Sequence, residues 1–379
     1  MRGVSVAGIG MTAFGRHLDR NLQSLSAEAV SDALADAGLQ PGDVQAAYVG
    51  NAFAGITTGQ EAVRGQVSLL GAVARGIPIY NVENACASSA TGFQLAWLAV
   101  AAGQVDTALV LGVEKLFHED RTTAGRALRT AGDVVESAGQ PNYFMRIYAN
   151  RAAAFAERSG ATPLHFAMVS MKNRRHGSLN PLAHHRIEVT LDEVLESTMI
   201  EVPLTRLMCS PIADGAAAVV LRASDLDRGR RAIPVRAAVV IGGGLDEPVP
   251  RRAAKLAYER AGVGPEDLDL VELHDGASPA ELDLYEQLGL CRAGEAVRMI
   301  ATGESSLGGR LPVNSSGGLL ARGHPVGATG IAQVHELVCQ IRGEAGARQI
   351  PNARVGLAEN AGGYVGGDTA AGTAIILGR

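Results

Sequence analysis

Short apolar runs alternate with longer segments of helical periodicity along this chain, and one such unit occurs twice. Residues 33–49 (ALADAGLQPGDVQAAYV) align with residues 257–273 (AYERAGVGPEDLDLVEL) at a constant offset of 224, the separation of Gly38 from Gly262. Each copy predicts a helix that ends at its glycine, a short turn that begins at a proline, and then a strand. Because an apolar run also precedes each copy, the pattern predicts two βαβ-type halves.

Two short stretches lie at equivalent places in these halves, each where a strand-like run gives way to a helix-like one. They are Asn84-Ala-Cys-Ala-Ser-Ser89 and Gly323-His-Pro-Val-Gly-Ala-Thr-Gly330. Two further pairs align between the halves: Asn84 with Asn314, and Thr91-Gly92 with Thr329-Gly330. Ligands in such sheets bind at the carboxyl ends of the strands, so halves related by a pseudo-twofold axis would bring both stretches into one cleft.

Residues 115–205 interrupt the repeat and are predicted to form an inserted loop domain. Two helices are predicted within it, one over about 143–159 and one from Pro163 to near Gly177. The predicted division is residues 1–114 with 206–230 for the first half, 115–205 for the insert and 231–379 for the second half. The fold class expected from this order is α/β.

Composition and charge narrow the possible classes of protein. The chain has 379 residues, of which 47% are hydrophobic and 19% charged, as in a folded protein large enough for two cores. A net charge of -5 offers no bulk attraction to nucleic acid or anionic lipid. No apolar run approaches the roughly 18 residues that span a bilayer, and no signal-peptide pattern begins the chain. We therefore expect a cytoplasmic protein that binds neither nucleic acid nor membranes.

The cysteines and histidines point to covalent chemistry rather than to a metal. Four cysteines lie far apart without a Cys-x-x-Cys pair, which predicts neither a disulfide framework nor a metal site. Cys86 precedes an apolar helix-like run, where helix amides and the imidazolium of His324 would lower a thiol pKa from about 8.5. A thiolate formed in this way can attack a thioester.

The most concentrated positive charge lies at the C-terminal end of the second helix of the insert, at Lys172-Asn-Arg-Arg-His176. Lys172, Arg174 and Arg175 predict a binding place for a phosphate-bearing substrate arm. The alternative is a solvated helix end whose cations complement the helix dipole.

Taken together, these motifs resemble those of thiolases, particularly the sterol-carrier-protein-type and archaeal acetoacetyl-CoA thiolases. The resemblance covers nearly the whole chain. It rests on Asn84–Ser89, Lys172-Asn173 with Asn180-Pro181, Leu204–Pro211 followed by Asp214–Ala217, His274-Asp275, and Gly323–Pro325 with Gly327–Gly330.

The resemblance implies a five-layered αβαβα fold, an inserted loop domain that holds coenzyme A, and a homodimer or tetramer. Coenzyme A or an acyl-CoA would be the substrate, with no permanently bound cofactor. Cys86 would take the acyl group, His324 would activate its thiol, and His274 would hydrogen-bond a substrate thioester oxygen. Further residues implied at the oxyanion and substrate site are Asn314, Asn360 and Gly362. Turn formation alone is the alternative for the first and last of these.

The chain departs from the family pattern at the second cysteine, which thiolases use as acid and base. The family carries it in a Cys-x-Gly motif or at the third position of a His-Asp-Cys-Phe motif. Here these places are Asn360-Ala-Gly362 and His274-Asp-Gly-Ala277. An asparagine amide does not titrate, so proton transfer at the substrate α-carbon needs another group or a water. The candidates in or beside these motifs are His274, Tyr364 and Glu359.

Three functions are compatible with these residues. The leading hypothesis is a thiolase-type acyltransferase that cleaves or forms the C–C bond of a 3-oxoacyl-CoA through an S-acyl-Cys86 intermediate. Because some family members act only beside a small zinc-ribbon and OB-fold protein, we expect such a partner subunit. A retro-aldolase acting on a CoA thioester would explain the missing thiol but leaves Cys86 and His324 without a role. A non-catalytic subunit that binds CoA esters is opposed by the presence of His274 beside these two residues.

Overall fold

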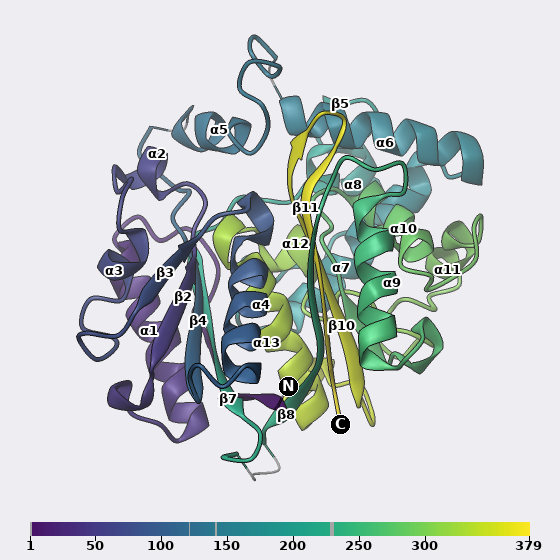
Figure 1. Cartoon of the computed structure of the whole chain (residues 1–379). Coiled ribbons are helices and arrows are strands. Elements are labelled where there is room, and N and C mark those ends of the chain that lie inside the picture. The colour runs from purple at the N-terminus through teal and green to yellow at the C-terminus, as the bar shows by residue number, and fades with distance from the viewer. Residues whose placement is uncertain (1, 121, 141, 228–230) are drawn as a thin grey trace.

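The computed structural model describes residues 2–120, 122–140, 142–227 and 231–379 and has the predicted α/β architecture (Figure 1). Its main sheet has the strand order β3-β2-β4-β7-β1-β8-β11-β10-β9 in the described part of the chain. These strands are β1 Val4–Met11, β2 Ala46–Gly50, β3 Ile79–Val82, β4 Thr107–Glu114, β7 Gly215–Ala223, β8 Ile233–Gly242, β9 Leu270–Glu272, β10 Val355–Val365 and β11 Asp368–Gly378. A separate pair consists of β5 Met199–Glu201 and β6 Leu204–Thr205.

The strand pairing confirms the predicted duplication. In the first half, β2 pairs in parallel with β3 and β4, and β7 is antiparallel to both β4 and β1. In the second half, β9 pairs in parallel with β10 and, through a bridge between Val271 and Val313, with a segment equivalent to β3. β11 is antiparallel to both β10 and β8, as β7 is to its neighbours. Each half therefore repeats one topology.

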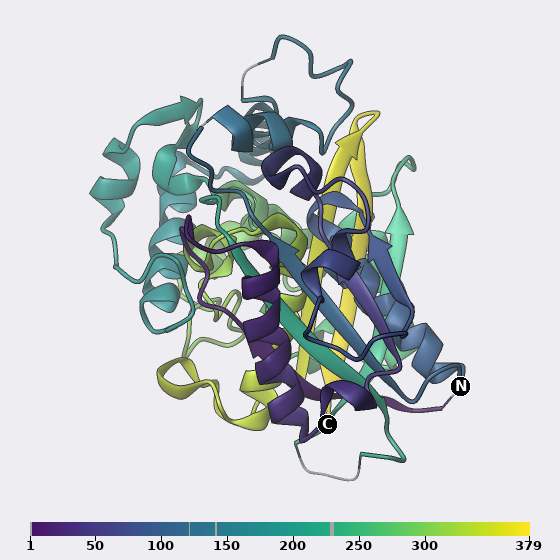
Figure 2. The ribbon, with the colours of Figure 1, turned by 90° about the vertical axis from the view of Figure 1, so that its left-hand side faces the viewer.

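Helices complete five layers around the two halves of the sheet (Figures 1 and 2). α4 and α13 lie between the halves and contact strands of both, whereas α1 covers the outer face of the first half and α9 that of the second. The helices are α1 Leu22–Ala37, α2 Ala54–Thr58, α3 Arg64–Ser68, α4 Ser88–Ala101, α5 Thr122–Arg129, α6 Tyr143–Ser159, α7 Pro163–Ser178, α8 Leu191–Glu196, α9 Val249–Ala261, α10 Ser278–Gln287, α11 Ala296–Ala301, α12 Gly318–Arg322 and α13 Thr329–Arg342. None of the helices in the described residues is both long enough and apolar enough to cross a bilayer.

Local sequence explains how α1 and α9 end and how closely α1 approaches its sheet. Both helices stop at the predicted glycines, Gly38 and Gly262, each with a left-handed φ of 66°. In β1, a Cβ added at Gly8 would lie 2.2 Å from the carbonyl oxygen of Ala33 in α1. Only glycine therefore allows the helix to lie directly on this strand.

The insert places its helices above the carboxyl ends of the strands (Figure 1). α6 and α7 have the predicted extents, and both contact α10 of the second half. Phe155 of α6 and Phe166 of α7 are buried in a core that they share with the second half. The boundaries given for the insert and the two halves stay a prediction.

One detail of the predicted alignment between the halves is wrong. α4 and α13 each have 14 residues, and each directly follows a short 3-10 turn. Ser88 is therefore the structural equivalent of Thr329, three residues before the Thr91 that the sequence alignment chose. The extra turn of chain in the second half is α12, which has no counterpart before Cys86.

Candidate active site

Cys86 lies in the 3-10 turn Ala85–Ala87 between β3 and α4, and local hydrogen bonds fix this turn. Ala85 adopts a left-handed φ of 48°. The Ser88 hydroxyl accepts a hydrogen bond from the Asn84 amide at 3.0 Å and donates one to the Ala85 carbonyl at 2.6 Å. The thiol is therefore presented at the start of α4, as predicted, by a turn with little freedom to move.

His324 reaches the thiol from the second half. Its Nε2 atom lies 3.3 Å from the Cys86 Sγ atom, and its backbone amide donates to the Pro211 carbonyl. Its Nδ1 atom lies 2.7 Å from the Thr329 hydroxyl oxygen, and that hydroxyl donates to the Pro325 carbonyl. Because the threonine proton is used in this way, Nδ1 carries the imidazole proton and Nε2 is left free to accept one.

His274 completes a group of three side chains. It follows β9, and its backbone amide donates to the Glu359 carboxylate at 3.0 Å. Its ring meets the His324 ring edge to face with centroids 5.2 Å apart. One donor atom from each of Cys86, His274 and His324 lies within 4.8 Å of the others. The buried Nε2 atom of His274 has no hydrogen-bond partner among the described residues.

The electrostatics of this group differ from the sequence expectation. Burial first and the Glu114 carboxylate second raise the pKa of the Cys86 thiol to about 12, although the backbone amides of Cys86 and Gly363 act in the opposite direction. Burial and then His274 lower the pKa of His324 well below its usual value. The expected lowering of the thiol pKa is therefore wrong, because burial outweighs the helix amides. At neutral pH the pair is a neutral thiol beside a neutral imidazole.

Gly362 and Asn360 of β10 lie against the Cys86 turn and the central helices. A Cβ added at Gly362 would come within 2.0 Å of the Asn84 carbonyl oxygen, so the strand can pack on the turn only with glycine here. The Asn360 side-chain amide donates to Gln333 of α13 at 3.1 Å. Its buried oxygen has no partner in the described part of the chain.

Asn314 and Lys172 lie in a buried polar network. The Asn314 amide oxygen accepts from the Leu273 amide, and its nitrogen donates to the Glu281 carboxylate at 2.8 Å. The Lys172 ammonium lies 2.6 Å from the same carboxylate and donates to the Val313 carbonyl. Lys172 is only 4% exposed, which contradicts its predicted place at a phosphate.

Arg174 and Arg175 remain accessible at the surface of α7. Arg174 is half-buried and donates to the Ile187 carbonyl at 3.2 Å, whereas Arg175 is exposed and lines a groove of about 990 Å³. Burial and then the nearby Arg206 lower the pKa of Arg174. The charges of Arg174 and Arg206 therefore repel each other here, and Arg206 is a cation that the sequence analysis missed.

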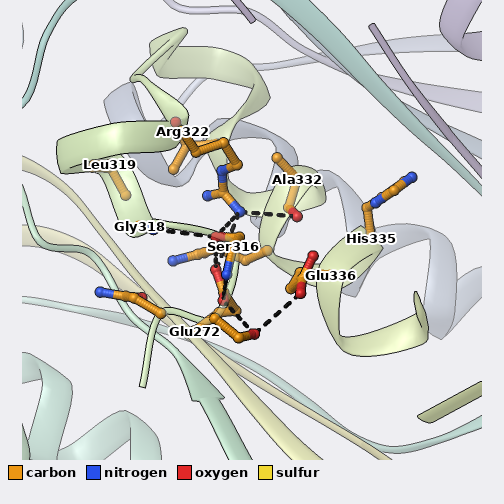
Figure 3. Close-up of polar contacts among 12 residues, drawn as sticks. Glu272, Ser316, Gly318, Leu319, Arg322, Ala332, His335 and Glu336 are labelled. Atoms are coloured by element: carbon orange, nitrogen blue, oxygen red, sulfur yellow. Dashed lines mark hydrogen bonds and ion pairs between the residues drawn. The ribbon is translucent and has the colours of Figure 1, made fainter. Parts of the chain in front are cut away.

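A buried ion pair joins the segments that carry the two histidines (Figure 3). Glu272 and Arg322 stand two residues before His274 and His324 respectively. The Arg322 Nη1 atom lies 3.2 Å from the Glu272 carboxylate and 3.0 Å from the Ser316 hydroxyl, which itself donates to Glu272. Both charged side chains are at most 1% exposed. This pair therefore fixes the relative placement of the two imidazoles.

A cavity of about 480 Å³ opens beside this group of three residues. His274, Ala361 and Tyr148 are among its lining residues. The sequence analysis missed Tyr148, although the helical spacing of Tyr148, Ala152 and Phe155 points it toward the body of the molecule.

The donor atoms of the site also suit a metal ion of the zinc type. A thiolate and two imidazoles are ligands that Zn²⁺ binds well, and Cys86, His274 and His324 bring them together. The hydrogen bond from His324 to Thr329 resembles the outer contact of a metal-bound histidine. The same geometry equally serves proton transfer from thiol to imidazole.

Family models match most of the chain. The model described as the thiolase N-terminal domain matches residues 4–225, and the one described as thiolase C-terminal domain-like matches residues 247–379. The chain therefore belongs to the thiolase family, and the resemblance seen in the sequence is confirmed.

Curated relatives agree with this assignment. An acetyl-CoA acetyltransferase of Methanothermobacter thermautotrophicus is 39% identical over 97% of this chain and 98% of its own. The benzoylsuccinyl-CoA thiolase subunit BbsB of Thauera aromatica is 36% identical over 96% and 95%. Sterol carrier protein 2 of Bos taurus is 34% identical over 95% of this chain and 70% of its own.

Solved structures share the fold over the full chain. The Ltp2–ChsH2(DUF35) aldolase superposes with a TM-score of 0.80 and 26% identity, covering 100% of this chain and 98% of that one. Human mitochondrial 3-ketoacyl-CoA thiolase in complex with CoA gives a TM-score of 0.74 at 17% identity, over 100% and 98%, which shows the common fold. The expected thiolase fold is therefore confirmed.

Proposed function

We propose that this chain is a thiolase-type acyltransferase that cleaves or forms the C–C bond of a 3-oxoacyl-CoA through an acyl group carried on Cys86. The observation that carries the proposal is the 3.3 Å contact between the Cys86 Sγ atom and the His324 Nε2 atom, in a tautomer set by Thr329. As sulfur attacks the substrate carbonyl, its proton moves to Nε2. Because both groups are neutral at rest, His324 acts as a general base and no thiolate is formed in advance.

His274 is proposed to stabilise charge on the substrate thioester oxygen. Its Nε2 atom is buried, has no partner in the described residues and lines the cavity beside Cys86. Burial lowers its pKa to about 4, so the ring is neutral and can donate one N–H to an oxyanion. A donor held ready in a dry site of this kind contributes about 10²- to 10³-fold in kcat. Gly362 supports the same site by its close packing on the Cys86 turn.

Arg174, Arg175 and Arg206 are proposed to hold the phosphates of coenzyme A. The two accessible arginines of α7 keep the role predicted from sequence, and Arg206 replaces the buried Lys172. Support comes from the electrostatic repulsion of Arg174 by Arg206, which a bound anion would relieve.

A homodimer or tetramer and a zinc-ribbon or OB-fold partner subunit also belong to the proposal. β3 lies at one edge of the sheet, and its Tyr80 side chain is 49% exposed, which offers a free edge to a second copy. One relative is named as a thiolase subunit, and one structural neighbour is a two-protein aldolase. A cytoplasmic location completes the proposal.

A retro-aldolase acting on a CoA thioester is the second candidate. The specific observation in its favour is the likeness to the Ltp2–ChsH2(DUF35) aldolase, together with the absence of a thiol at Gly276 and Asn360. It gives no role to the contact between Cys86 and His324. A non-catalytic subunit that binds CoA esters is the third candidate, and the same contact counts against it.

Intact-mass measurement with a panel of acyl-CoAs separates these candidates. The purified chain, Cys86→Ala and a control, Cys209→Ala, are each mixed with aliphatic, aromatic and dicarboxylic acyl-CoAs and quenched in acid. Cys209 is a suitable control because it is also a partly buried thiol, but its hydrogen bond goes to the Thr205 carbonyl and not to an imidazole.

We expect one acyl group on the wild-type chain and on Cys209→Ala, and none on Cys86→Ala. Turnover that survives Cys86→Ala would replace the acyltransferase with the aldolase. A chain with neither adduct nor turnover, alone or with its partner, would favour the non-catalytic subunit.

A further inference from the structure

Neither position at which thiolases carry their second cysteine offers a titrating group in this chain, and at one of them a different side chain takes the space. At the other position, the side-chain amide of Asn360 donates a hydrogen bond to the Gln333 side chain. At Gly276, an added Cβ would lie 2.3 Å from the Tyr148 hydroxyl oxygen and 2.7 Å from the ring carbon that bears it. A side chain at position 276 and the phenol at position 148 therefore exclude each other.

Backbone conformation does not require glycine at position 276. Gly276 is absent from the residues of the described chain that have positive φ. The Gly276 carbonyl accepts a hydrogen bond from the Ser210 amide, as in an ordinary pair of strands. Among the described residues, the three atoms nearest to a Cβ at this position all belong to Tyr148, so the phenol lies where the absent thiol would be.

The Tyr148 hydroxyl is placed to meet a substrate. Tyr148 and His274 line the same cavity of about 480 Å³. The Tyr148 side chain packs against the buried cluster of Ala149, Leu204 and Ala277. In the described residues the hydroxyl has no hydrogen-bond partner. Half-buried Tyr148 therefore presents a free O–H to the cavity that His274 also lines.

Burial keeps the proton of the phenol in place. Burial first, then Cys86, raise the pKa of Tyr148 well above its usual range, while the Arg151 guanidinium acts in the opposite direction. The geometry relates the phenol to the thiol through His274, which lies within 4.8 Å of the thiol and lines the same cavity as Tyr148. At neutral pH Tyr148 is therefore a protonated donor.

We propose that Tyr148 is the proton donor to the substrate α-carbon, in the place where other thiolases use a second cysteine. This inference rests on the proposed acyltransferase function and names the residue that completes it.

In the cleavage direction, Cys86 sulfur attacks the 3-keto carbon of the 3-oxoacyl-CoA and its proton passes to His324. The C2–C3 bond breaks, leaving the acyl group on sulfur and an acyl-CoA enolate. The enolate takes the proton of the Tyr148 hydroxyl and leaves as a shorter acyl-CoA. The phenolate then takes the thiol proton of coenzyme A, whose thiolate attacks the acyl-Cys86. The Cys86 thiolate departs and recovers its proton from His324, so every proton is returned.

Proton exchange at the α-carbon tests this role separately from acyl transfer. Wild type, Tyr148→Phe and Tyr143→Phe are incubated in D₂O with acetyl-CoA, propionyl-CoA and succinyl-CoA, and deuterium at the α-carbon is followed by mass spectrometry. Tyr143 is a matched control because it lies on the same helix, and its hydroxyl is outside the cavity. Acylation of Cys86 is measured on the same samples by intact mass.

We expect Tyr148→Phe to lose α-carbon exchange by about 10²- to 10⁴-fold, the usual contribution of a general acid or base. Cys86 acylation should fall far less, because His324 still takes the thiol proton and the departing coenzyme A thiolate, which otherwise takes the Tyr148 proton, can be protonated by water. Tyr143→Phe should match wild type in both assays. As a rescue, Tyr148→Ala combined with Gly276→Cys should regain exchange, since the first change opens the space that the new thiol needs.

Two results would overturn the inference: exchange unchanged in Tyr148→Phe, or no exchange by wild type with any of the three thioesters. Loss of exchange in Tyr364→Phe with Tyr148→Phe unaffected would assign the role to Tyr364 instead. By contrast, a wild-type chain that is never acylated at Cys86 would refute the proposed acyltransferase function, whichever residue donates the proton.

Discussion

Thr329→Val is the sharpest test of how His324 is held. In the wild type the Thr329 hydroxyl oxygen accepts the Nδ1 proton at 2.7 Å, which leaves Nε2 as the base for Cys86. Valine has nearly the same shape but cannot accept, so the buried Nδ1–H loses its only partner. A buried donor without a partner costs about 1–3 kcal/mol. If this cost falls on the reactive tautomer, the rate of Cys86 acylation drops by about 5- to 160-fold.

The assay is stopped-flow or rapid-quench acylation of Cys86, with Thr329→Ser as the matched control. Serine keeps the hydroxyl oxygen and should stay within about threefold of wild type. Melting curves are recorded in parallel, since the same hydroxyl also donates to the Pro325 carbonyl. A Thr329→Val chain that acylates as fast as Thr329→Ser would refute the idea that this bond sets the tautomer.

Three further changes probe the support of the site. Arg322→Met leaves the Glu272 carboxylate buried without its cation and should cost about 3–5 kcal/mol of unfolding free energy in urea, whereas a loss below about 1 kcal/mol would show that the pair matters little. Gly362→Ala pushes a Cβ to within 2.0 Å of the Asn84 carbonyl oxygen, so acylation should fall at least about tenfold while Gly125→Ala, which has open space, changes nothing. Burial raises the pKa of Glu359 from 4.5 to about 7, so the folded state binds this proton more tightly than the unfolded state, and wild-type stability relative to Glu359→Gln should fall as pH rises through this interval. A pH-independent stability difference between these two chains would contradict the last prediction.

Much of the fold could be predicted from the sequence, because helix ends and repeats are marked by local sequence patterns. Gly38, Gly262 and Pro163 mark helix ends that depend on backbone conformation alone, and the structure has them where predicted. The constant offset between the halves predicted that both have the same topology. The error of three residues at Thr91 arose because α12 was inserted before His324, and a sequence offset cannot distinguish an insertion from a shift.

The site could be predicted only in part, because the burial and charge pairing of its residues depend on segments that are far apart in the sequence. The sequence brought Cys86 and His324 together, yet it assigned the thiol a lowered pKa because a helix start was visible and the buried carboxylate of Glu114 was not. Lys172 looked solvent-exposed until the fold placed Glu281 against it. Tyr148 lies more than a hundred residues from Gly276, and only the packing of α6 reveals that the two compete for one space.

The most direct test of the central claim is exchange of labelled coenzyme A into an acyl-CoA with no carbon nucleophile present. Acyl transfer to Cys86 and back requires only the first half of the reaction, so the wild-type chain should incorporate label with any acyl-CoA that it accepts, and Cys86→Ala should incorporate none. Equal exchange by the two chains, or its absence from the wild type across the panel, would contradict a covalent role for Cys86.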